Sequence, residues 1–252
     1  MKRITAVITL LVFSLLLVVS SPQAAEVIML SGPASMTDAL KELIAQFGAS
    51  GNHAQVLPNF GSSGAMAKQI NERAPADVFI SANQKWMTFL RDEKRIDSTT
   101  EKNLACNTLV FVGTTNPAVT SMADVVKLKQ IAIGSPTSVP AGEYAAQAMK
   151  KAGIYKKLEE GKQLIMAKDV RQALTYADRG ETAGAFVYRT DALLATQAVI
   201  LFEVPQELYD RVTYPVALTV DGAKKPEAKA FYAFITGPEA MKVFIKYGFS
   251  AE

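Results

Sequence analysis

The chain has 252 residues, which is enough for one large domain or two smaller ones. Hydrophobic residues make up 49% of the sequence and charged residues 20%, so the composition is globular and excludes disorder, collagen and coiled coil. The formal net charge is +3, an excess too small to indicate a nucleic-acid partner.

Cysteine and histidine are too scarce for several kinds of site. The chain has one cysteine, Cys106, and one histidine, His53. A single cysteine cannot form an intramolecular disulfide, and the two residues cannot supply a Cys/His zinc centre. A catalytic pair would have to use His53, which lies in a turn-like run, so we expect a solvated histidine there. We expect Cys106 to be a buried small residue.

The first 25 residues have the pattern of a secretory signal peptide. Lys2 and Arg3 precede an uncharged, mostly apolar run, which ends in small residues. This pattern predicts export and cleavage near Ala24 or Ala25. The alternative is an uncleaved membrane anchor, because the run is nearly long enough to span a bilayer. The segment contains no cysteine, so we expect no lipid attachment.

Short apolar runs alternate with amphipathic stretches along the rest of the chain. The predicted strands cover residues 26–30, 54–57, 77–81, 108–113, 130–134, 164–167, 184–188, 199–204 and 213–220. Apolar residues at helical spacing lie between them, as at 40–47 and 170–177, and prolines open two further helices near 226–235 and 238–247. The alternation predicts an α/β fold with mainly parallel sheets. No internal repeat or long linker is visible.

Four predicted helix starts are rich in serine, glycine and alanine, or carry an acidic cap. They lie at residues 34–38, 60–66, 136–142 and 169–172. In the first, we expect Ser35 to cap the helix with Asp38 three residues later, and in the last Asp169 begins a D-x-x-Q cap. Helix starts present unpaired N–H groups that bind anions. Two interpretations fit these four helix starts. Their residues cap the helices and do nothing more, or they form a small-ligand site beyond the strand ends.

Common catalytic and nucleotide-binding motifs are not matched. The run Gly61–Ala65 departs from the nucleophile elbow G-x-S-x-G, because Ala65 occupies the last glycine position. Neither a phosphate-binding G-x-x-x-x-G-K-[ST] loop nor a strand-linked G-x-G-x-x-G occurs, so nucleotide binding is unsupported. We expect Trp86 to be a packing residue.

Seven segments, in this order, carry a resemblance to a known family. They are Ala34–Thr37, Asn59–Gly64, Ala74–Ala82, Val139–Ala145, Asp169–Arg171, Val187–Tyr188 and Lys246–Phe249. The chain resembles the periplasmic molybdate-binding proteins of bacterial ABC importers, which are type II substrate-binding proteins. The similarity covers essentially the whole chain after the predicted signal peptide, and the set is specific although each segment alone is weak.

The resemblance implies a set of residues that hold a molybdate oxyanion, namely Ser35, Ser63, Ala141, Val170 and Tyr188. The serines would donate hydroxyl and backbone N–H hydrogens, Ala141 and Val170 backbone N–H hydrogens, and Tyr188 its phenol hydrogen. No residue would bind the metal directly, and no cofactor is implied beyond the molybdate or tungstate ligand. The first loop departs from the family, since Pro33 stands in a usual run of alanines and removes one N–H.

The resemblance also implies a two-lobed clamshell that closes on its ligand. We expect one lobe at residues 26–107 and 215–252 and the other at 108–214, with the cleft between them. Such a protein would act as a monomer and deliver molybdate, and tungstate, to a membrane permease. The alternatives are a binding protein for another anion such as sulfate, and, further away, an enzyme on a similar clamshell.

Overall fold

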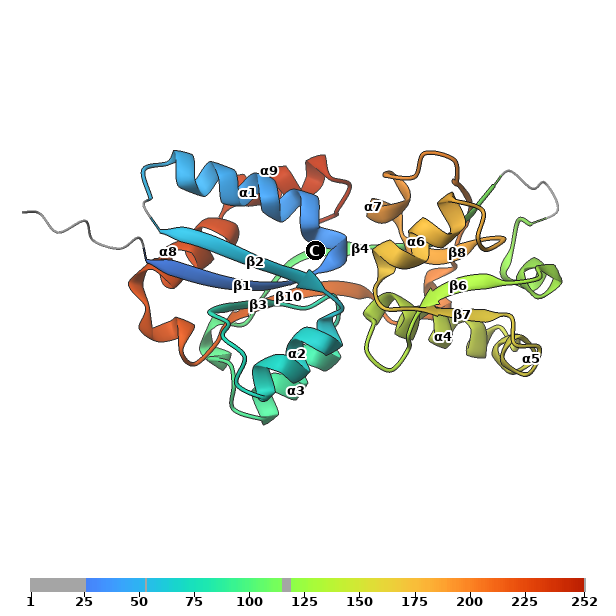
Figure 1. The fold of residues 1–252 in the computed structure, drawn as a ribbon, viewed down its shortest axis with the longest axis horizontal. Coiled ribbons are helices and arrows are strands. Elements are labelled where there is room, and N and C mark those ends of the chain that lie inside the picture. Colours follow the sequence, from blue (N-terminus) through green and yellow to red (C-terminus); the bar gives the residue numbers. More distant parts are fainter. Residues whose placement is uncertain (1–25, 53, 115–118, 252) are drawn as a thin grey trace, which may run out of the picture.

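The computed structural model describes residues 26–52, 54–114 and 119–251 (Figure 1). The predicted signal peptide and His53 lie outside these described residues. No helix within them is both long and apolar enough to cross a membrane.

The first of two sheets has the strand order β2-β1-β3-β10-β4. Its strands are β1 (Val27–Pro33), β2 (Gln55–Gly61), β3 (Val78–Ile80), β4 (Lys102–Asn107) and β10 (Val212–Leu218). Strand β1 pairs in parallel with β2 and β3, whereas β10 is antiparallel to both of its neighbours, β3 and β4. The sheet is therefore parallel except for one reversed strand.

Helices cover both faces of the first sheet. They are α1 (Thr37–Ala49), α2 (Ser63–Asn71), α3 (Gln84–Asp92), α8 (Pro226–Ile235) and α9 (Pro238–Lys246), with 3-10 turns at Ala34–Met36, Ser98–Thr100 and Gly222–Lys224. Helices α1, α8 and α9 form one layer, and α2 and α3 form the other (Figure 1). Helix α1 buries Leu40, Leu43 and Phe47, and the Phe47 ring meets Phe231 of α8 edge-on. The predicted 3.6-residue spacing explains this buried face.

The second sheet repeats this arrangement with the order β7-β6-β8-β5-β9. Its strands are β5 (Leu109–Gly113), β6 (Ile131–Gly134), β7 (Leu164–Ala167), β8 (Ala185–Tyr188) and β9 (Val199–Glu203). Its helices are α4 (Pro140–Lys151), α5 (Tyr155–Glu160), α6 (Val170–Asp178) and α7 (Arg189–Ala192), with 3-10 turns at Met122–Lys127 and Gln206–Leu208. Strand β5 is the reversed one, antiparallel to β8 and β9.

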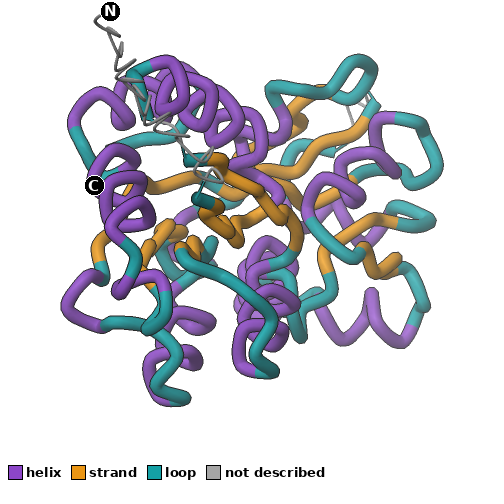
Figure 2. Tube along the Cα trace, turned by 60° about the vertical axis from the view of Figure 1, so that its left-hand side comes forward, coloured by secondary structure: helices purple, strands orange, loops and turns teal. Residues whose placement is uncertain are grey.

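The chain forms two lobes side by side, each built on one of these sheets (Figure 1). Strand β4 leads into β5 through Thr108, and the segment between β9 and β10 returns the chain to the first sheet. Figure 2 shows the strands running through the interior of the molecule with helices around them. The reversed strands β10 and β5 are the ones that directly follow a crossing between lobes.

The structure confirms the predicted two-lobed α/β fold. All nine predicted strands are present with ends shifted by a few residues, and both proline-opened helices appear as α8 and α9. Strand β4 (Lys102–Asn107) was not predicted. Its short apolar centre is flanked by polar Asn103 and Asn107, so the strand lacks the apolar alternation by which the others were found. Cys106 and Trp86 are buried, as predicted.

The predicted capping role of Ser35 is wrong. Ser35 lies inside the 3-10 turn Ala34–Met36, and α1 is capped by Met36 without a side-chain hydrogen bond. The Ser35 hydroxyl instead bonds Tyr214, and the Asp38 carboxylate accepts a hydrogen bond from Arg171. Both side chains make tertiary contacts, which outcompete the local capping box.

Candidate functional site

The two serines lie beyond the ends of neighbouring parallel strands. Strands β1 and β2 end opposite each other, with Pro33 paired to Gly61. Ser35 follows β1 in the 3-10 turn, and Ser63 is the first residue of α2, just after β2. Both serines are buried. Because carboxyl ends of parallel strands meet at one edge of a sheet, the chain brings these hydroxyls together.

The Ser63 hydroxyl has its oxygen engaged by the protein. The oxygen accepts a hydrogen bond of 2.9 Å from the backbone N–H of Ala82, which lies just beyond β3. A hydroxyl carries one hydrogen, so this contact leaves the Ser63 hydrogen available for donation to another group.

The second lobe contributes three residues from equivalent positions. Val170 is the first residue of α6, after β7, and Ala141 is in the first turn of α4, after β6. Tyr188 is the last residue of β8. Strands β7, β6 and β8 are neighbours running in the same direction, so these residues also share one sheet edge.

All five predicted residues line one narrow cavity between the lobes. The cavity is also lined by Pro33, Ala34, Gly61, Ser62, Ala82, Val139, Pro140 and Asp169. The space that the centre of a water-sized sphere can occupy is about 10 Å³, which is room for one water molecule. Most of the lining residues are buried, so a ligand of several atoms can enter only when the lobes separate. The structure therefore has the cleft closed.

Hydrogen-bond donors that have no partner among the described residues line this cavity. The Tyr188 hydroxyl is buried and has no hydrogen-bond partner among the described residues. Burial raises the pKa of Tyr188 well above its ordinary value, so the phenol keeps its hydrogen. The first N–H groups of α2, α4 and α6, at Ser63, Ala141 and Val170, have no acceptor within their own helices. The arrangement suits a ligand that only accepts hydrogen bonds.

Charge at the cavity comes from helix ends rather than from cations. Helices α2, α4 and α6 each begin there, and a helix start carries about half a positive charge. Asp169 is the one lining residue with a charged side chain, and its Oδ1 accepts the Gln172 N–H at 2.9 Å. This is the cap predicted from the D-x-x-Q pattern. No cluster of three or more potential metal-ligating side chains occurs in the described parts of the chain.

One set of contacts closes the lobes on the side of α2. The Gly64 N–H donates to the Ser138 carbonyl of the second lobe at 2.9 Å. Glu143 of α4 accepts hydrogen bonds from Asn83 and Lys85 of the first lobe. A Cβ on Gly64 would lie 2.5 Å from the Ser138 oxygen, so only glycine fits this approach.

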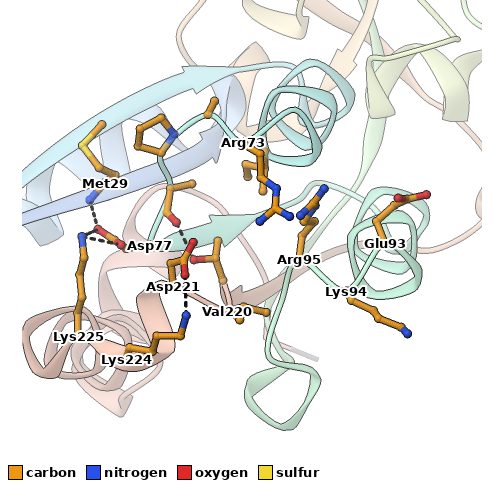
Figure 3. Close-up of a pocket in the computed structure, with 15 residues that line it drawn as sticks. Met29, Arg73, Asp77, Glu93, Lys94, Arg95, Val220, Asp221, Lys224 and Lys225 are labelled. Atoms are coloured by element: carbon orange, nitrogen blue, oxygen red, sulfur yellow. Dashed lines mark hydrogen bonds and ion pairs between the residues drawn. The ribbon is translucent and has the colours of Figure 1, made fainter.

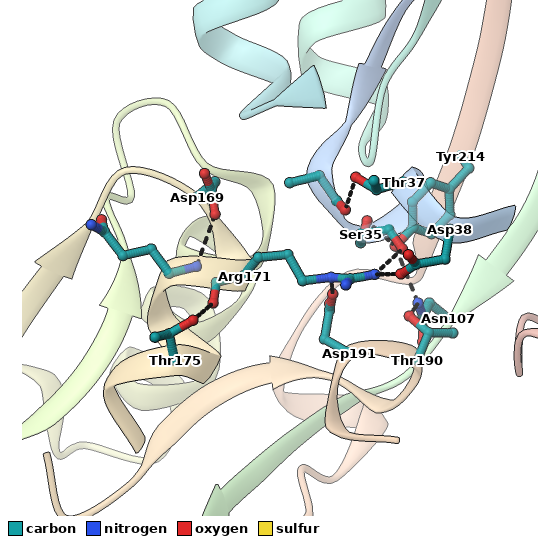
Figure 4. A network of polar contacts seen from close by, with 12 residues as sticks. Ser35, Thr37, Asp38, Asn107, Asp169, Arg171, Thr175, Thr190, Asp191 and Tyr214 are labelled. Atoms are coloured by element: carbon teal, nitrogen blue, oxygen red, sulfur yellow. Dashed lines mark hydrogen bonds and ion pairs between the residues drawn. The ribbon is translucent and has the colours of Figure 1, made fainter. Parts of the chain in front are cut away.

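A second set of contacts closes the opposite side through Arg171 of α6 (Figure 4). The guanidinium donates to the Asp38 carboxylate at 2.9 Å and to the Ser35 carbonyl at 3.4 Å, both in the first lobe. Its Nε also donates to Oδ1 of Asp191 in its own lobe. Asp191 is 0% exposed, and its other carboxylate oxygen has no partner among the described residues.

The buried Asp191 carboxylate is electrostatically costly. Burial raises the pKa of Asp191 to about 6, although Arg171 acts to lower it. Burial also acts to lower the pKa of Arg171, but Asp191 and Asp38 outweigh it and raise that pKa. Arg171 therefore stays charged and bridges the lobes beside the cavity.

A larger hollow lies at the other end of the first sheet (Figure 3). It has a volume of about 700 Å³ and is lined by residues near the starts of β1 and β3, including Met29 and Asp77. Lys225 pairs with Asp77, and Lys224 with Asp221. Its basic residues Arg73 and Lys94 follow the ends of α2 and α3, where cations offset the negative helix end.

Five of the lining residues were predicted from the sequence, but the contacts that hold them were not. Asp191, Asn107 and Tyr214 were not singled out, and Arg171 was noted only as part of a matched segment. Arg171 meets Asp38, and Asn107 meets Tyr214, across more than 100 positions of sequence, and Asp191 meets Arg171 across 20. No local spacing encodes such pairs.

Comparisons with known proteins agree with this architecture. The sequence profile described as "Bacterial extracellular solute-binding protein" matches residues 28–250. The chain belongs to the bacterial extracellular solute-binding protein family. It is 36% identical over 225 residues to the molybdate-binding protein ModA of Escherichia coli, covering 86% of each chain. It is also 36% identical over 225 residues to a putative ABC transporter substrate-binding lipoprotein, YvgL, of Bacillus subtilis, covering 88% of this chain and 86% of the relative.

A solved structure supports the fold independently. The periplasmic molybdate-binding protein of Azotobacter vinelandii superposes with a TM-score of 0.80 at 24% sequence identity. The match covers 89% of this chain and 99% of that one. The solute-binding protein described here therefore shares the complete two-lobed architecture, and both of its lobes are represented in the relative.

Proposed function

We propose that this protein captures molybdate, and tungstate, in the cavity between its lobes. Ser35 and Ser63 of the first lobe and Ala141, Val170 and Tyr188 of the second would hold the oxyanion. The observation that carries the proposal is that these five residues line one closed cavity, where the buried Tyr188 hydroxyl lacks a partner among the described residues. Relatives that are 36% and 35% identical and named molybdate-binding proteins support the choice of ligand.

The ligand would bridge two lobes that close by a hinge motion. From the sequence we assigned residues 26–107 and 215–252 to one lobe and 108–214 to the other. Strand β10 begins at Val212, which pairs with Asn107, and this favours a second crossing just before Val212. Binding to both lobes stabilises the closed form, because the open form offers only part of the donor set.

The donor set explains selection among anions. Molybdate is a fully deprotonated dianion at neutral pH and accepts hydrogen bonds at every oxygen. Hydrogenphosphate carries an O–H that needs an acceptor, and leaving it unpaired in a buried site costs about 1–3 kcal/mol. Sulfate has no such hydrogen and is separated by size, since donors spaced for longer metal–oxygen bonds contact it poorly. Tungstate is nearly the size of molybdate, and we expect it to bind comparably.

Binding rather than catalysis fits the serines of the cavity. The Ser63 oxygen accepts from the Ala82 N–H, and the Ser35 oxygen bonds the neutral phenol of Tyr214, so neither contact supplies a base to take a serine proton. The titratable side chains lining the cavity are Asp169, which caps α6, and Tyr188. We therefore propose a binding protein without enzymatic activity and without a cofactor.

The cellular role follows from the family and from the predicted signal peptide. Export with cleavage near Ala24 or Ala25 would bring the protein to the periplasm, where it would pass its anion to the membrane permease of an ABC importer. The cavity is lined by residues of a single chain, so a monomer suffices for capture.

Isothermal titration calorimetry on the purified, ligand-free protein tests the proposal. Molybdate and tungstate should bind at a ratio of one anion per chain, at least 100-fold more tightly than sulfate or phosphate. Sulfate binding as tightly as molybdate would replace the proposed ligand with another anion. A titration in which none of the four anions gives heat or raises the melting temperature would contradict anion capture altogether.

A further inference from the structure

A chain of hydrogen bonds runs from the junction of the two lobes to Ser35 (Figure 4). The Thr108 N–H donates to Oδ1 of Asn107 at 2.8 Å. The Asn107 amide nitrogen donates to the Thr190 hydroxyl at 2.9 Å and lies 3.1 Å from the Tyr214 hydroxyl. The Tyr214 hydroxyl lies 3.1 Å from the Ser35 Oγ. We call the series Thr108, Asn107, Tyr214 and Ser35 the hydroxyl relay.

The direction of each hydrogen bond in the relay follows from its first donor. A backbone N–H only donates, so the Asn107 atom that meets Thr108 must be the amide oxygen. The other amide atom is then the nitrogen, which only donates, so the Tyr214 oxygen accepts from it. Ser35 is the other hydrogen-bond partner of the Tyr214 hydroxyl among the described residues, so the Tyr214 hydrogen is left for Ser35 and the Ser35 oxygen accepts it. The hydrogen of Ser35 is thereby left for the cavity.

Burial keeps these directions fixed. Ser35, Asn107 and Tyr214 are all buried, so bulk water does not compete for their hydrogens. Burial raises the pKa of Tyr214, which therefore stays a neutral donor. Its ring is held edge-on between Tyr188 and Phe249, with centroids 6.0 and 5.2 Å away. The hydroxyl cannot swing away from Ser35 without moving these rings.

We propose that Tyr214 is a specificity-determining positioning residue that sets Ser35 as a hydrogen-bond donor toward the bound anion. This inference rests on the proposed function. Ser63 is set as a donor by a single backbone N–H, that of Ala82, whereas Ser35 depends on the side chains of Asn107 and Tyr214. With both serines set as donors, the site favours fully deprotonated oxyanions over those that carry a hydrogen.

The test is a double-mutant cycle that pairs Tyr214→Phe with Ser35→Ala, read by calorimetry with molybdate. Tyr214→Phe keeps the ring but removes the hydrogen that Ser35 accepts, so the Kd for molybdate should rise about tenfold, the loss of one hydrogen bond. In the Ser35→Ala background the same change should alter the Kd less than twofold, because Tyr214 acts only through Ser35. Affinity for phosphate should not fall in Tyr214→Phe.

The matched control is Tyr209→Phe. Tyr209 is another buried tyrosine, and its hydroxyl accepts from the Leu109 N–H rather than contacting Ser35. This variant should bind molybdate as the wild type does. If Tyr214→Phe fails to fold, Asn107→Leu breaks the relay one step earlier, and its effect on the Kd should likewise vanish when Ser35 is alanine.

The outcomes separate this inference from the proposed function. A wild-type protein that ignores molybdate refutes the function. Wild-type binding with an unchanged Kd in Tyr214→Phe refutes the relay alone. The relay is also refuted if Tyr214→Phe weakens molybdate binding equally in the wild type and in Ser35→Ala, since Tyr214 would then act through the fold.

Discussion

The two lobes share one plan but present different chemistry to the cleft. In each, three parallel strands deliver the site residues from their carboxyl ends, and the fourth strand in the order is reversed. The first lobe supplies the hydroxyls of Ser35 and Ser63. The second supplies the N–H groups of Ala141 and Val170 and the Tyr188 phenol.

The two lobes differ in how many of these side-chain hydroxyls already make hydrogen bonds within the protein. Both serine oxygens make hydrogen bonds within the first lobe, to Ala82 and to Tyr214. The Tyr188 hydroxyl has no partner among the described residues. We therefore propose that the first lobe is preorganised for an anion, whereas the second leaves a buried donor unpaired until a ligand arrives. The same strand geometry therefore provides both a preformed half-site and one completed by closure.

Removing the serine hydroxyls of the first lobe should have the largest effect on molybdate binding. The double change Ser35→Ala and Ser63→Ala deletes two hydrogen bonds to a dianion, each worth about 1.5–3 kcal/mol, so the Kd for molybdate should rise about 1,000-fold. Tyr188→Phe deletes one and should raise it roughly 10- to 100-fold. Calorimetry on both variants measures the asymmetry. Equal losses would show that the first lobe is not the dominant half-site.

The buried carboxylate of the second lobe should make stability depend on pH. The pKa of Asp191 rises from 3.8 unfolded to about 6 when folded, mainly through burial. Folding is therefore favoured by the bound proton below pH 4, and this contribution is lost as pH rises through 6. Relative to Asp191→Asn, the wild type should lose about 2 kcal/mol of unfolding free energy between pH 4 and 6.5. Urea denaturation across this range measures the difference.

Asp178 provides the control of opposite sign. Backbone N–H groups of Ala198 and Gln197 hold the pKa of this carboxylate down, at about 2. Its contribution to stability is present above pH 4 and is lost as pH falls toward 2. Asp178→Asn should therefore change the pH dependence below pH 4 only. A flat difference between wild type and Asp191→Asn would contradict the account of Asp191.

The contact between lobes can be tested at Gly64. A methyl group there would lie 2.5 Å from both the Ser138 oxygen and the Trp86 ring, so Gly64→Ala should hold the lobes apart. We expect about 30-fold weaker molybdate binding, roughly 2 kcal/mol, and a larger radius of gyration by small-angle X-ray scattering with molybdate present. Gly48→Ala in α1 is the control, because nothing lies within 4 Å of its added methyl. That variant should bind normally.

Much of the fold followed from local patterns in the sequence. Apolar runs located nine strands, and prolines marked the starts of α8 and α9. The Asp169 cap was read correctly from its spacing to Gln172. Four of the five predicted site residues lie in the helix starts that local patterns picked out, and family resemblance then named them. Tyr188 came from the resemblance alone, because a tyrosine at a strand end carries no local signal of its own.

The rest was hidden because it depends on tertiary contacts. Strand β4 (Lys102–Asn107) was missed since its polar ends break the apolar alternation; Asn103 and Asn107 bond Tyr214 instead. Ser35 and Asp38 fit a local capping box, yet their side chains bond Tyr214 and Arg171. Where distant partners are available in a buried site, they override a cap worth about 1 kcal/mol.

The crystal structure of the protein with molybdate tests the central claim most directly, using the anomalous signal of the metal to locate it. The account predicts one molybdenum between the lobes, with its oxygens within hydrogen-bond distance of Ser35, Ser63, Ala141, Val170 and Tyr188 and no protein atom bound to the metal. Molybdate bound instead in the hollow near Arg73 and Lys94, or contacting only one lobe, would contradict it.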